Sequence, residues 1–129
     1  MMVVDSSVLI AFLRGRKAAA RFLRGHGGSG PLVVPAIAAY ELWRGARSRH
    51  ETESVRKLLD AVTVDPFTPA LARLAGDLDV DQRRRGTQRP SIDLLIAAHA
   101  IHRNCPLGTV DRDYSGITGL DVVEAPKGP

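Results

Sequence analysis

Residues 2–10 read Met-Val-Val-Asp-Ser-Ser-Val-Leu-Ile, an apolar run that stops at an acid and two serines before apolar residues resume. A short run without polar alternation is typical of a strand buried on both faces in a parallel sheet. Asp5 then ends this strand at the carboxyl edge, where open α/β sheets bind their ligands. The competing interpretation is that Asp5 only caps the helix that follows, a common role for aspartate.

Size and composition predict one globular domain over residues 1–129, with residues 124–129 as a frayed tail. The chain is 44% hydrophobic and 25% charged, which is ordinary for a globular protein. No apolar run approaches the ~20 residues of a membrane span, and no basic segment precedes the first apolar one, as in a signal peptide. Cys105 is the only cysteine, which excludes an intrachain disulfide and a cysteine-based zinc site. We therefore expect a cytoplasmic protein.

Apolar segments of strand length alternate with segments of helical period along the whole chain. The expected strands are 2–5, 32–34, 62–64, 106–110 and 120–123. The expected helices are 8–13, 17–23, 36–47, 50–61, one that opens at Thr68-Pro69 and ends near 82–86, and 92–102, capped by Ser91. Residues 26–31 contain three glycines and a proline and are expected to form a loop. This alternation predicts an α/β fold with a short parallel sheet of about five strands and helices on both faces.

Four acids stand at special places in this arrangement. Asp5 and Asp111 end the first and fourth strands, Glu41 lies early in the helix after the second strand, and Asp93 lies in the first turn of the last helix. All four point toward one rim of a parallel sheet, where crowded carboxylates raise each other's pKa values. Mg²⁺ or Mn²⁺ prefers such oxygen ligands and removes the repulsion. A bound divalent ion also activates water and stabilises charge on a phosphoryl group.

The neighbours of these acids favour the same interpretation. Asp93 lies in an almost continuous apolar run, where an acid is costly unless it caps a helix, pairs or binds a metal. The hydroxyl groups of Ser7 and Thr109 are near enough in sequence to hold Asp5 and Asp111 in place. Taken alone, Glu41 is better interpreted as a solvated surface residue, with Gly45 at the start of a turn.

The chain is basic, with a net charge of +4 at pH 7 and only three lysines among its 18 cations. Arginine presents a planar fork suited to phosphate, so the bias is compatible with nucleic-acid contact, although genomic base composition explains it equally well. The run 83–85 is also compatible with a merely solvated helix end. The candidate RNA-contacting residues are Arg14, Arg16, Lys17, Arg44, Arg47, Arg83, Arg84 and Arg85.

Four segments together resemble the PIN-domain ribonucleases, and specifically the VapC toxins of type II (VapBC) toxin–antitoxin systems. They are Val4–Ile10, Glu41–Gly45, Asp93–Ala100 and Thr109–Tyr114, followed by Ile117–Leu120. The segments occur in the family's order and span nearly the whole chain. Each is weak by itself, whereas the set is specific.

The resemblance implies a PIN-like fold and a Mg²⁺- or Mn²⁺-dependent endoribonuclease that uses water to cleave RNA. The acids that match the family's metal ligands and catalytic residues are Asp5, Glu41, Asp93 and Asp111. Ser7 or Thr109 matches a supporting hydroxyl, and Asp113 is an auxiliary acid. Many members carry asparagine at position 111, so either Asp111 or Asp113 is the nearer ligand, and we favour Asp111.

The resemblance also implies a cognate VapB-like antitoxin whose C-terminal segment inhibits the enzyme, and a homodimer that forms a heterotetramer or larger assembly with it. A groove between helical segments 8–23 and 51–62 suits an amphipathic peptide. Two other functions compete with this one. A catalytically silent PIN-like domain that binds RNA or protein retains the fold without the chemistry. A receiver-type phosphoacceptor domain needs adjacent acids near the first strand and a lysine opposite the site. The first strand has no such pair of acids, and none of Lys17, Lys57 and Lys127 stands at a suitable position.

Overall fold

The computed structural model describes all residues from 1 to 129 and has a five-stranded parallel sheet in the order β3-β2-β1-β4-β5. The strands are β1 (Met2–Val4), β2 (Leu32–Pro35), β3 (Thr63–Asp65), β4 (Leu107–Thr109) and β5 (Val122–Glu124). The helices are α1 (Ser6–Leu13), α2 (Lys17–Gly27), α3 (Ala36–Gly45), α4 (Arg49–Asp60), α5 (Pro69–Arg84) and α6 (Ser91–Arg103), with a 3₁₀ turn at Arg112–Tyr114. The expected parallel α/β sheet with about five strands is confirmed.

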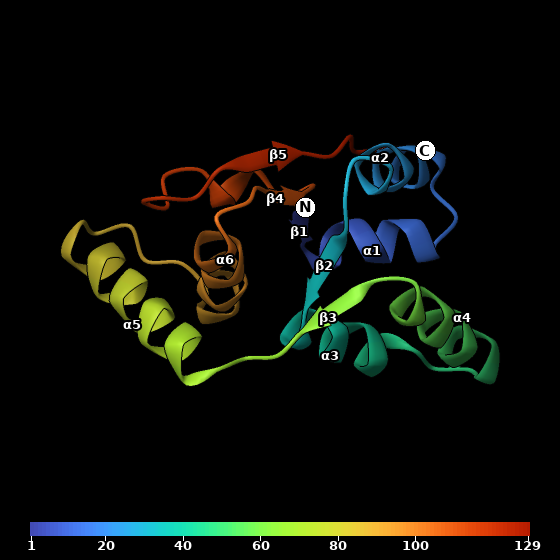
Figure 1. Cartoon of the computed structure of the whole chain (residues 1–129), viewed down its shortest axis with the longest axis horizontal. Helices are drawn as coiled ribbons and strands as arrows, with labels where there is room; N and C mark the ends of the chain where they lie inside the picture. Colours follow the sequence, from blue (N-terminus) through green and yellow to red (C-terminus); the bar gives the residue numbers. More distant parts are fainter.

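Helices cover both faces of this sheet. The chain moves from β1 through β2 to β3 in one direction, then returns to β4 and β5 on the other side of β1. Crossovers of constant hand then place α1 to α4 on one face and α5 and α6 on the other. Figure 1 shows the two groups on opposite sides of the strands, with α5 packed on the outer side of α6.

The core is the middle of the sheet and the helix faces turned toward it. Val3, Val4 and Val34 are fully buried, and Val33 is 1% exposed. Val3 pairs with Val33 on one side and with Leu107 on the other. These strands lack polar alternation because both of their faces are covered.

Gly108 in β4 allows α2 to approach the sheet closely. A Cβ atom at this position would lie 3.0 Å from the Met2 side chain and 3.1 Å from the Phe22 ring of α2. The backbone oxygen of Gly108 also accepts a hydrogen bond from the amide of Asp5 at 2.9 Å. The absence of a side chain therefore leaves room for Met2 and Phe22, while the backbone of Gly108 joins β4 to the end of β1.

Several expected boundaries differ from the structure. α1 begins at Ser6 rather than at residue 8, α3 ends at Gly45 rather than at residue 47, and β5 begins at Val122 rather than at residue 120.

Two further differences concern the expected loop and the expected tail. Residues 26 and 27 belong to α2 rather than to the loop, and the Gly28 amide donates to the Arg24 oxygen at 3.0 Å. The Phe22 and His26 rings contact each other in a tilted arrangement, with centroids 4.5 Å apart, and support this last turn despite its glycines. At the other end, the expected frayed segment 124–129 begins too early, because Glu124 is the last residue of β5 and Ala125 is buried.

Of the two expected N-caps at α5 and α6, the structure contains only the first. Thr68 caps α5 as expected, and its hydroxyl accepts from the Leu71 amide at 3.3 Å. Ser91 does not cap α6, which is a correction: it is the first helical residue, the cap position is Pro90, and no side-chain cap bond forms. Proline supplies the extended geometry that ends the preceding segment, so the serine moves one position into the helix. No helix in the fold combines the length and apolarity needed to cross a membrane.

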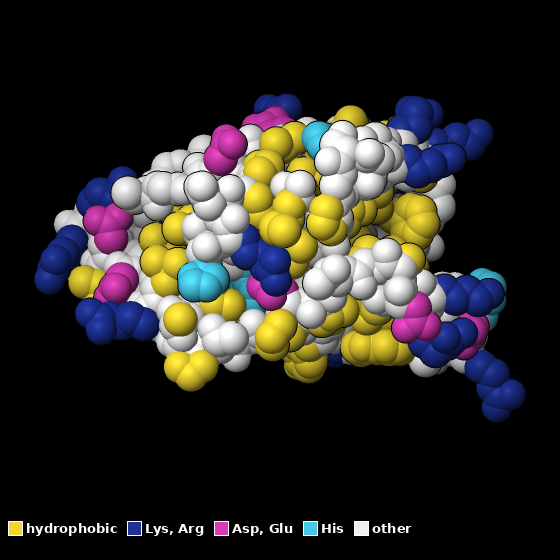
Figure 2. All heavy atoms as spheres, in the orientation of Figure 1, with side chains coloured by type: hydrophobic (Ala, Val, Ile, Leu, Met, Phe, Trp, Pro, Cys, Tyr) yellow, Lys and Arg dark blue, Asp and Glu magenta, His cyan; other side chains and the backbone are white.

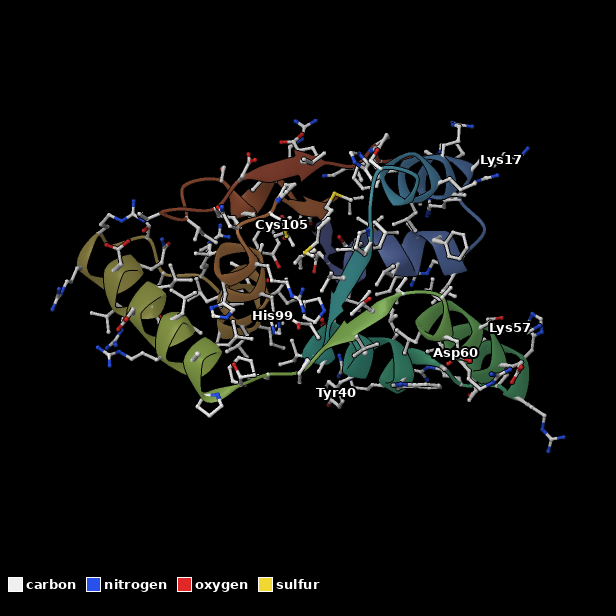
Figure 3. All side chains as sticks on the ribbon, in the orientation of Figure 1. Lys17, Tyr40, Lys57, Asp60, His99 and Cys105 are labelled. Atoms are coloured by element: carbon white, nitrogen blue, oxygen red, sulfur yellow. The ribbon has the colours of Figure 1, made fainter.

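A polar network inside the fold ties the edge strand β3 to α6. The Asp65 carboxylate, 7% exposed, lies 2.6 Å from Nδ1 of His99 and accepts from Nη2 of Arg103, also at 2.6 Å. Figure 3 shows His99 in the interior between α6 and β3. The bond from Arg103 outweighs burial and lowers the pKa of Asp65 below its ordinary value of 3.8. Asp65 therefore holds the edge of the sheet in place as an ionised carboxylate.

We expect Asp65→Asn to lower the free energy of unfolding by about 2–3 kcal/mol near neutral pH, because it breaks a charge pair in which Asp65 is buried and Arg103 is partly exposed. A depressed carboxyl pKa contributes stability that is present above the unfolded pKa and is lost as pH falls through the folded pKa. The difference between wild type and variant should therefore shrink below pH 3.8, the ordinary value for this carboxyl. Urea unfolding across this pH range measures it.

The control is Asp77→Asn, which breaks only the exposed pair with Arg73 and should cost less than about 0.5 kcal/mol. An equal effect of both variants at all pH values would contradict the structural role of Asp65.

Candidate active site

Asp5 lies at the point where the chain order of the sheet reverses, between β1 and β4. Its carboxylate is 6% exposed, and its Oδ2 atom accepts hydrogen bonds from the hydroxyls of Ser7 and Thr109, both at 2.9 Å. Asp5 occupies the cap position of α1, but its side chain makes no capping bond. The capping interpretation is therefore wrong, because the carboxylate is used across the sheet instead.

The two hydroxyl groups connect Asp5 to the segment after β4. Thr109 accepts from the Asp111 amide at 2.9 Å while it donates to Asp5, and Ser7 accepts from the Val110 amide at 3.3 Å. Thr109 has no exposed surface. This chain of bonds fixes Asp5 and the backbone of Asp111 relative to each other before any ligand binds.

Asp93 enters the same region from the first turn of α6. Burial raises its pKa, the negative charges of Asp5 and Asp111 raise it further, and the positive charge of Arg89 opposes them. The Tyr114 hydroxyl donates to Asp93 Oδ1 at 3.4 Å, which is a weak partner for a carboxylate. The structure thus brings Asp5, Asp93 and Asp111 within electrostatic reach, and the repulsion is only partly relieved.

Asp111 and Asp113 differ in their environments. Asp111 is half-buried, and its Oδ1 accepts from the Asp113 amide at 2.8 Å, so it caps the 3₁₀ turn. Asp113 is exposed and does not contribute to the raised pKa of Asp93. This arrangement supports Asp111 as the nearer acid.

Glu41 approaches the site from α3, apart from the three aspartates. Its Oε1 accepts from the Ser6 hydroxyl at 3.0 Å, and Ser6 directly follows Asp5. Glu41 also lines a cavity of ≈ 240 Å³ between α1, α3 and α4, together with Arg14, Leu13 and Val55. It is therefore linked to the site through α1 rather than packed among the three aspartates.

The donor set suits a hard divalent cation. Every candidate ligand is a carboxylate oxygen, the chemistry that Mg²⁺ and Mn²⁺ prefer. The raised pKa of Asp93 marks the place where added positive charge would be most stabilising. In their present positions, however, no three acidic, histidine or cysteine side chains form a group close enough to hold one metal ion. Binding would require the carboxylates to move toward each other.

The basic candidates are all exposed and fall into two groups. Arg14, Arg16, Lys17, Arg44 and Arg47 lie at the ends of α1, α2 and α3, whereas residues 83–85 lie at the end of α5. Figure 2 shows most Lys and Arg side chains toward the two ends of one face, with mixed hydrophobic and other surface between them. The Lys17 side chain projects from the outer end of α2 (Figure 3).

Three site residues were missed in the sequence. Ser6 holds Glu41, Tyr114 contacts Asp93, and Arg89 lies over the Tyr114 ring at 5.7 Å from its centroid. Ser6 could have been found from the adjacent pair of hydroxyl residues after Asp5. Arg89 and Tyr114 gave no such signal, because their proximity depends on how α6 meets the turn after β4.

Comparison with known proteins supplies independent information. A family model described as the PIN domain matches residues 2–120. Ribonuclease VapC10 of Mycobacterium tuberculosis (strain H37Rv) is 39% identical over 111 residues, which are 86% of this chain and 83% of the relative.

Solved structures share the fold over nearly the full length. VapBC2 from Rickettsia felis, bound to a DNA fragment from its promoter, has a chain that superposes with a TM-score of 0.88 at 18% identity, covering 97% of this chain and 98% of that one. The DNA-bound VapBC from Salmonella typhimurium gives a TM-score of 0.85 at 19% identity, with 95% and 96% covered. These likenesses establish the fold.

We expect Asp93→Asn to raise the melting temperature of the protein in EDTA at neutral pH. A carboxyl whose folded pKa is raised contributes stability that is present at low pH and lost as pH rises through that pKa. Asn removes the charge that Asp5 and Asp111 repel, so the gain should vanish in acid. Differential scanning fluorimetry measures both effects.

Asp113→Asn is the control for this measurement, since Asp113 is exposed, and it should leave the melting temperature unchanged. A lower melting temperature for Asp93→Asn than for wild type at neutral pH would show that the carboxylate stabilises the empty site.

Proposed function

The chain belongs to the PIN domain family, and from this premise we propose that it is a VapC-type endoribonuclease that requires Mg²⁺ or Mn²⁺. The observation that carries the proposal is that Asp5, Asp93 and Asp111, from three distant segments, come within electrostatic reach of one another near the switch point of the sheet. Ligand sites of open α/β sheets lie at this point. The 39% identity to a ribonuclease over most of the chain supports the same activity.

Each acid has a proposed role. Asp5, Asp93 and Asp111 hold the divalent ion, and Glu41 completes the site from α3. Ser7 and Thr109 keep the Asp5 carboxylate in position through their hydroxyls, and Asp113 is auxiliary. When bound, the ion supplies a Lewis acid that lowers the pKa of water and neutralises phosphate charge.

The proposed nucleophile is water rather than the RNA 2′-hydroxyl. Attack by the 2′-hydroxyl needs a positioned general base, most often histidine, that accepts its proton. The hydrogen bonds at Asp5, Asp93 and Asp111 involve only hydroxyl and amide groups. His99, the buried histidine, is paired with Asp65 instead.

Incubation of total cellular RNA with the protein and Mg²⁺ or Mn²⁺ tests the activity. We expect cleavage that stops in EDTA and falls at least ~100-fold in Asp5→Asn and Asp93→Asn, because metal-site residues and their supports each change activity by about 10–100-fold or more. Gel analysis with mapping of cleavage ends measures it.

Asp77→Asn removes an exposed acid from α5 and should cleave like wild type. RNA binding without cleavage under all metal conditions would favour the rival function, a catalytically silent RNA- or protein-binding domain. Cleavage that survives in Asp5→Asn and Asp93→Asn would falsify the proposed site.

We further propose a VapB-like antitoxin that covers the cavity between α1, α3 and α4. Ile10, Leu13, Leu42 and Val55 give it an apolar lining, and Glu41 reaches its rim. The amphipathic segment expected from the sequence would therefore lie against α1, α3 and α4, whereas α2 does not line the cavity. An inhibitor seated here would block access to Glu41.

The proposed assembly is a homodimer that binds antitoxin as a heterotetramer or larger complex in the cytoplasm. Exposed apolar side chains on α3 and on the adjacent edge strand β3, among them Trp43 and Val64, offer surface for two-fold pairing. Tyr40 projects outward from α3 (Figure 3).

Leu13→Glu places a charge in the apolar lining without touching the acids. We expect it to weaken inhibition by a co-expressed antitoxin at least ~10-fold while cleavage of RNA continues, since a buried unpaired charge costs more than the ~1.4 kcal/mol that tenfold requires. Titration of purified antitoxin against RNA cleavage measures it.

The matched control is Ala70→Glu, an exposed position on α5 away from the cavity. Equal inhibition of Leu13→Glu and wild type would mean that the antitoxin binds elsewhere.

A further inference from the structure

Arg89 lies in the segment between α5 and α6, four positions before Asp93. Its guanidinium carbon is 5.7 Å from the centroid of the Tyr114 ring. That ring is 1% exposed, and its hydroxyl reaches Asp93. Arg89 is therefore held against one side of a fixed aromatic ring whose polar end lies at the acid site.

The charge of Arg89 has no partner in the protein. None of the seven ion pairs within 4.0 Å includes it. Its Nη1 atom is buried and makes no hydrogen bond, although the residue as a whole is only half-buried. A charged donor that is shielded from water without an acceptor costs about 1–3 kcal/mol or more. Such a group requires an explanation.

The unpaired guanidinium of Arg89 lies close to the acids. Arg89 is near enough to act on the pKa of Asp93, yet it forms no ion pair with that carboxylate. The acids thus remain free to hold a cation, and the guanidinium remains free to hold an anion. The same site then offers carboxylates for a metal ion and a guanidinium for a phosphate, which are the two kinds of group that metal-assisted cleavage of a phosphodiester needs.

We propose that Arg89 binds a phosphate oxygen of the RNA strand beside the acid site, an inference that rests on the proposed function. A phosphodiester that approaches several carboxylates meets repulsion, which a cation at the rim offsets. Guanidinium forms paired hydrogen bonds with phosphate oxygens. Stacking on Tyr114 restricts the side chain in advance, so less conformational freedom is lost on binding.

This role differs from that of the eight exposed basic candidates. Those side chains lie in solvent at the ends of helices and attract RNA through their combined field, which salt screens. Arg89 is half-buried and held by an aromatic ring, so it fixes the position of one phosphate. We therefore assign it to substrate positioning next to Asp93.

The test measures RNA binding without cleavage, in EDTA, with a short mixed-sequence single-stranded RNA labelled for fluorescence anisotropy. We expect Arg89→Gln to weaken binding about tenfold, the effect of losing one charge-assisted hydrogen bond. The slope of log K against log salt should become shallower by about 0.7, the value for one phosphate contact on a single strand. Arg89→Lys should keep the slope but bind several-fold more weakly, because it lacks the planar fork.

Arg73→Gln is the matched control, since it removes the same charge from an exposed position on α5 and should keep the wild-type slope. An Arg89→Gln slope equal to that of Arg73→Gln overturns the inference. If Arg89→Gln does not fold, Arg89→Lys decides: several-fold weaker binding supports the inference, and wild-type binding overturns it. The inference is also overturned if Arg89→Gln lowers the Mn²⁺ affinity in isothermal calorimetry and leaves the RNA salt slope unchanged. Arg89 would then position the carboxylates rather than bind phosphate.

Cleavage assays separate this inference from the proposed function. A wild-type protein that cleaves no RNA, but whose binding slope depends on Arg89, contradicts the ribonuclease activity and leaves the phosphate contact standing. A wild type and an Arg89→Gln variant that cleave RNA with equal KM and equal salt slopes overturn the phosphate contact alone.

Discussion

The site depends on one constraint, the need to supply hydrogen-bond donors to the Asp5 carboxyl group in a residue that is only 6% exposed. Asp5 meets it by accepting two hydroxyl hydrogen bonds, from Ser7 on α1 and from Thr109 on β4. Removal of these donors would leave buried carboxyl oxygens without hydrogen-bond partners, which costs more than the bonds themselves stabilise the fold. The same two hydroxyls accept amide hydrogen bonds from the segment after β4. The positions of β1, α1 and Asp111 are therefore set together.

Two acids connected with α6, Asp65 and Asp93, have pKa values that are shifted in opposite directions. Asp65 has Arg103 and His99 as partners, and its pKa is lowered, so its charge stabilises the fold. Asp93 has burial and two negative neighbours, and its pKa is raised, so its charge opposes the fold. A protein tolerates the second arrangement where a ligand repays it. The contrast separates the structural role of Asp65 from the metal-binding role that is proposed for Asp93.

The basic residues also divide by environment. In the proposed function, exposed arginines at the helix ends supply a long-range field that steers RNA and weakens with salt. Arg89 acts at short range, because Tyr114 holds it beside the acids. Long-range attraction without a fixed contact would deliver RNA in many registers. A fixed contact without attraction would meet RNA too rarely, so the two kinds of cation are complementary.

The sequence by itself determined the sheet and the rim on which the acids lie. Apolar runs that end in Asp5 and Asp111 are local patterns, and parallel strands must bring their carboxyl ends to one edge. Only the tertiary structure decided which partners each acid has. Asp65 is joined to His99 and Arg103 across 34 and 38 residues, and Ser6 holds Glu41 across 35. Arg89, which precedes α6, reaches Tyr114 in the turn after β4. Local propensity reports the path of the backbone, whereas these contacts depend on where helices cross and on which side chains then become buried.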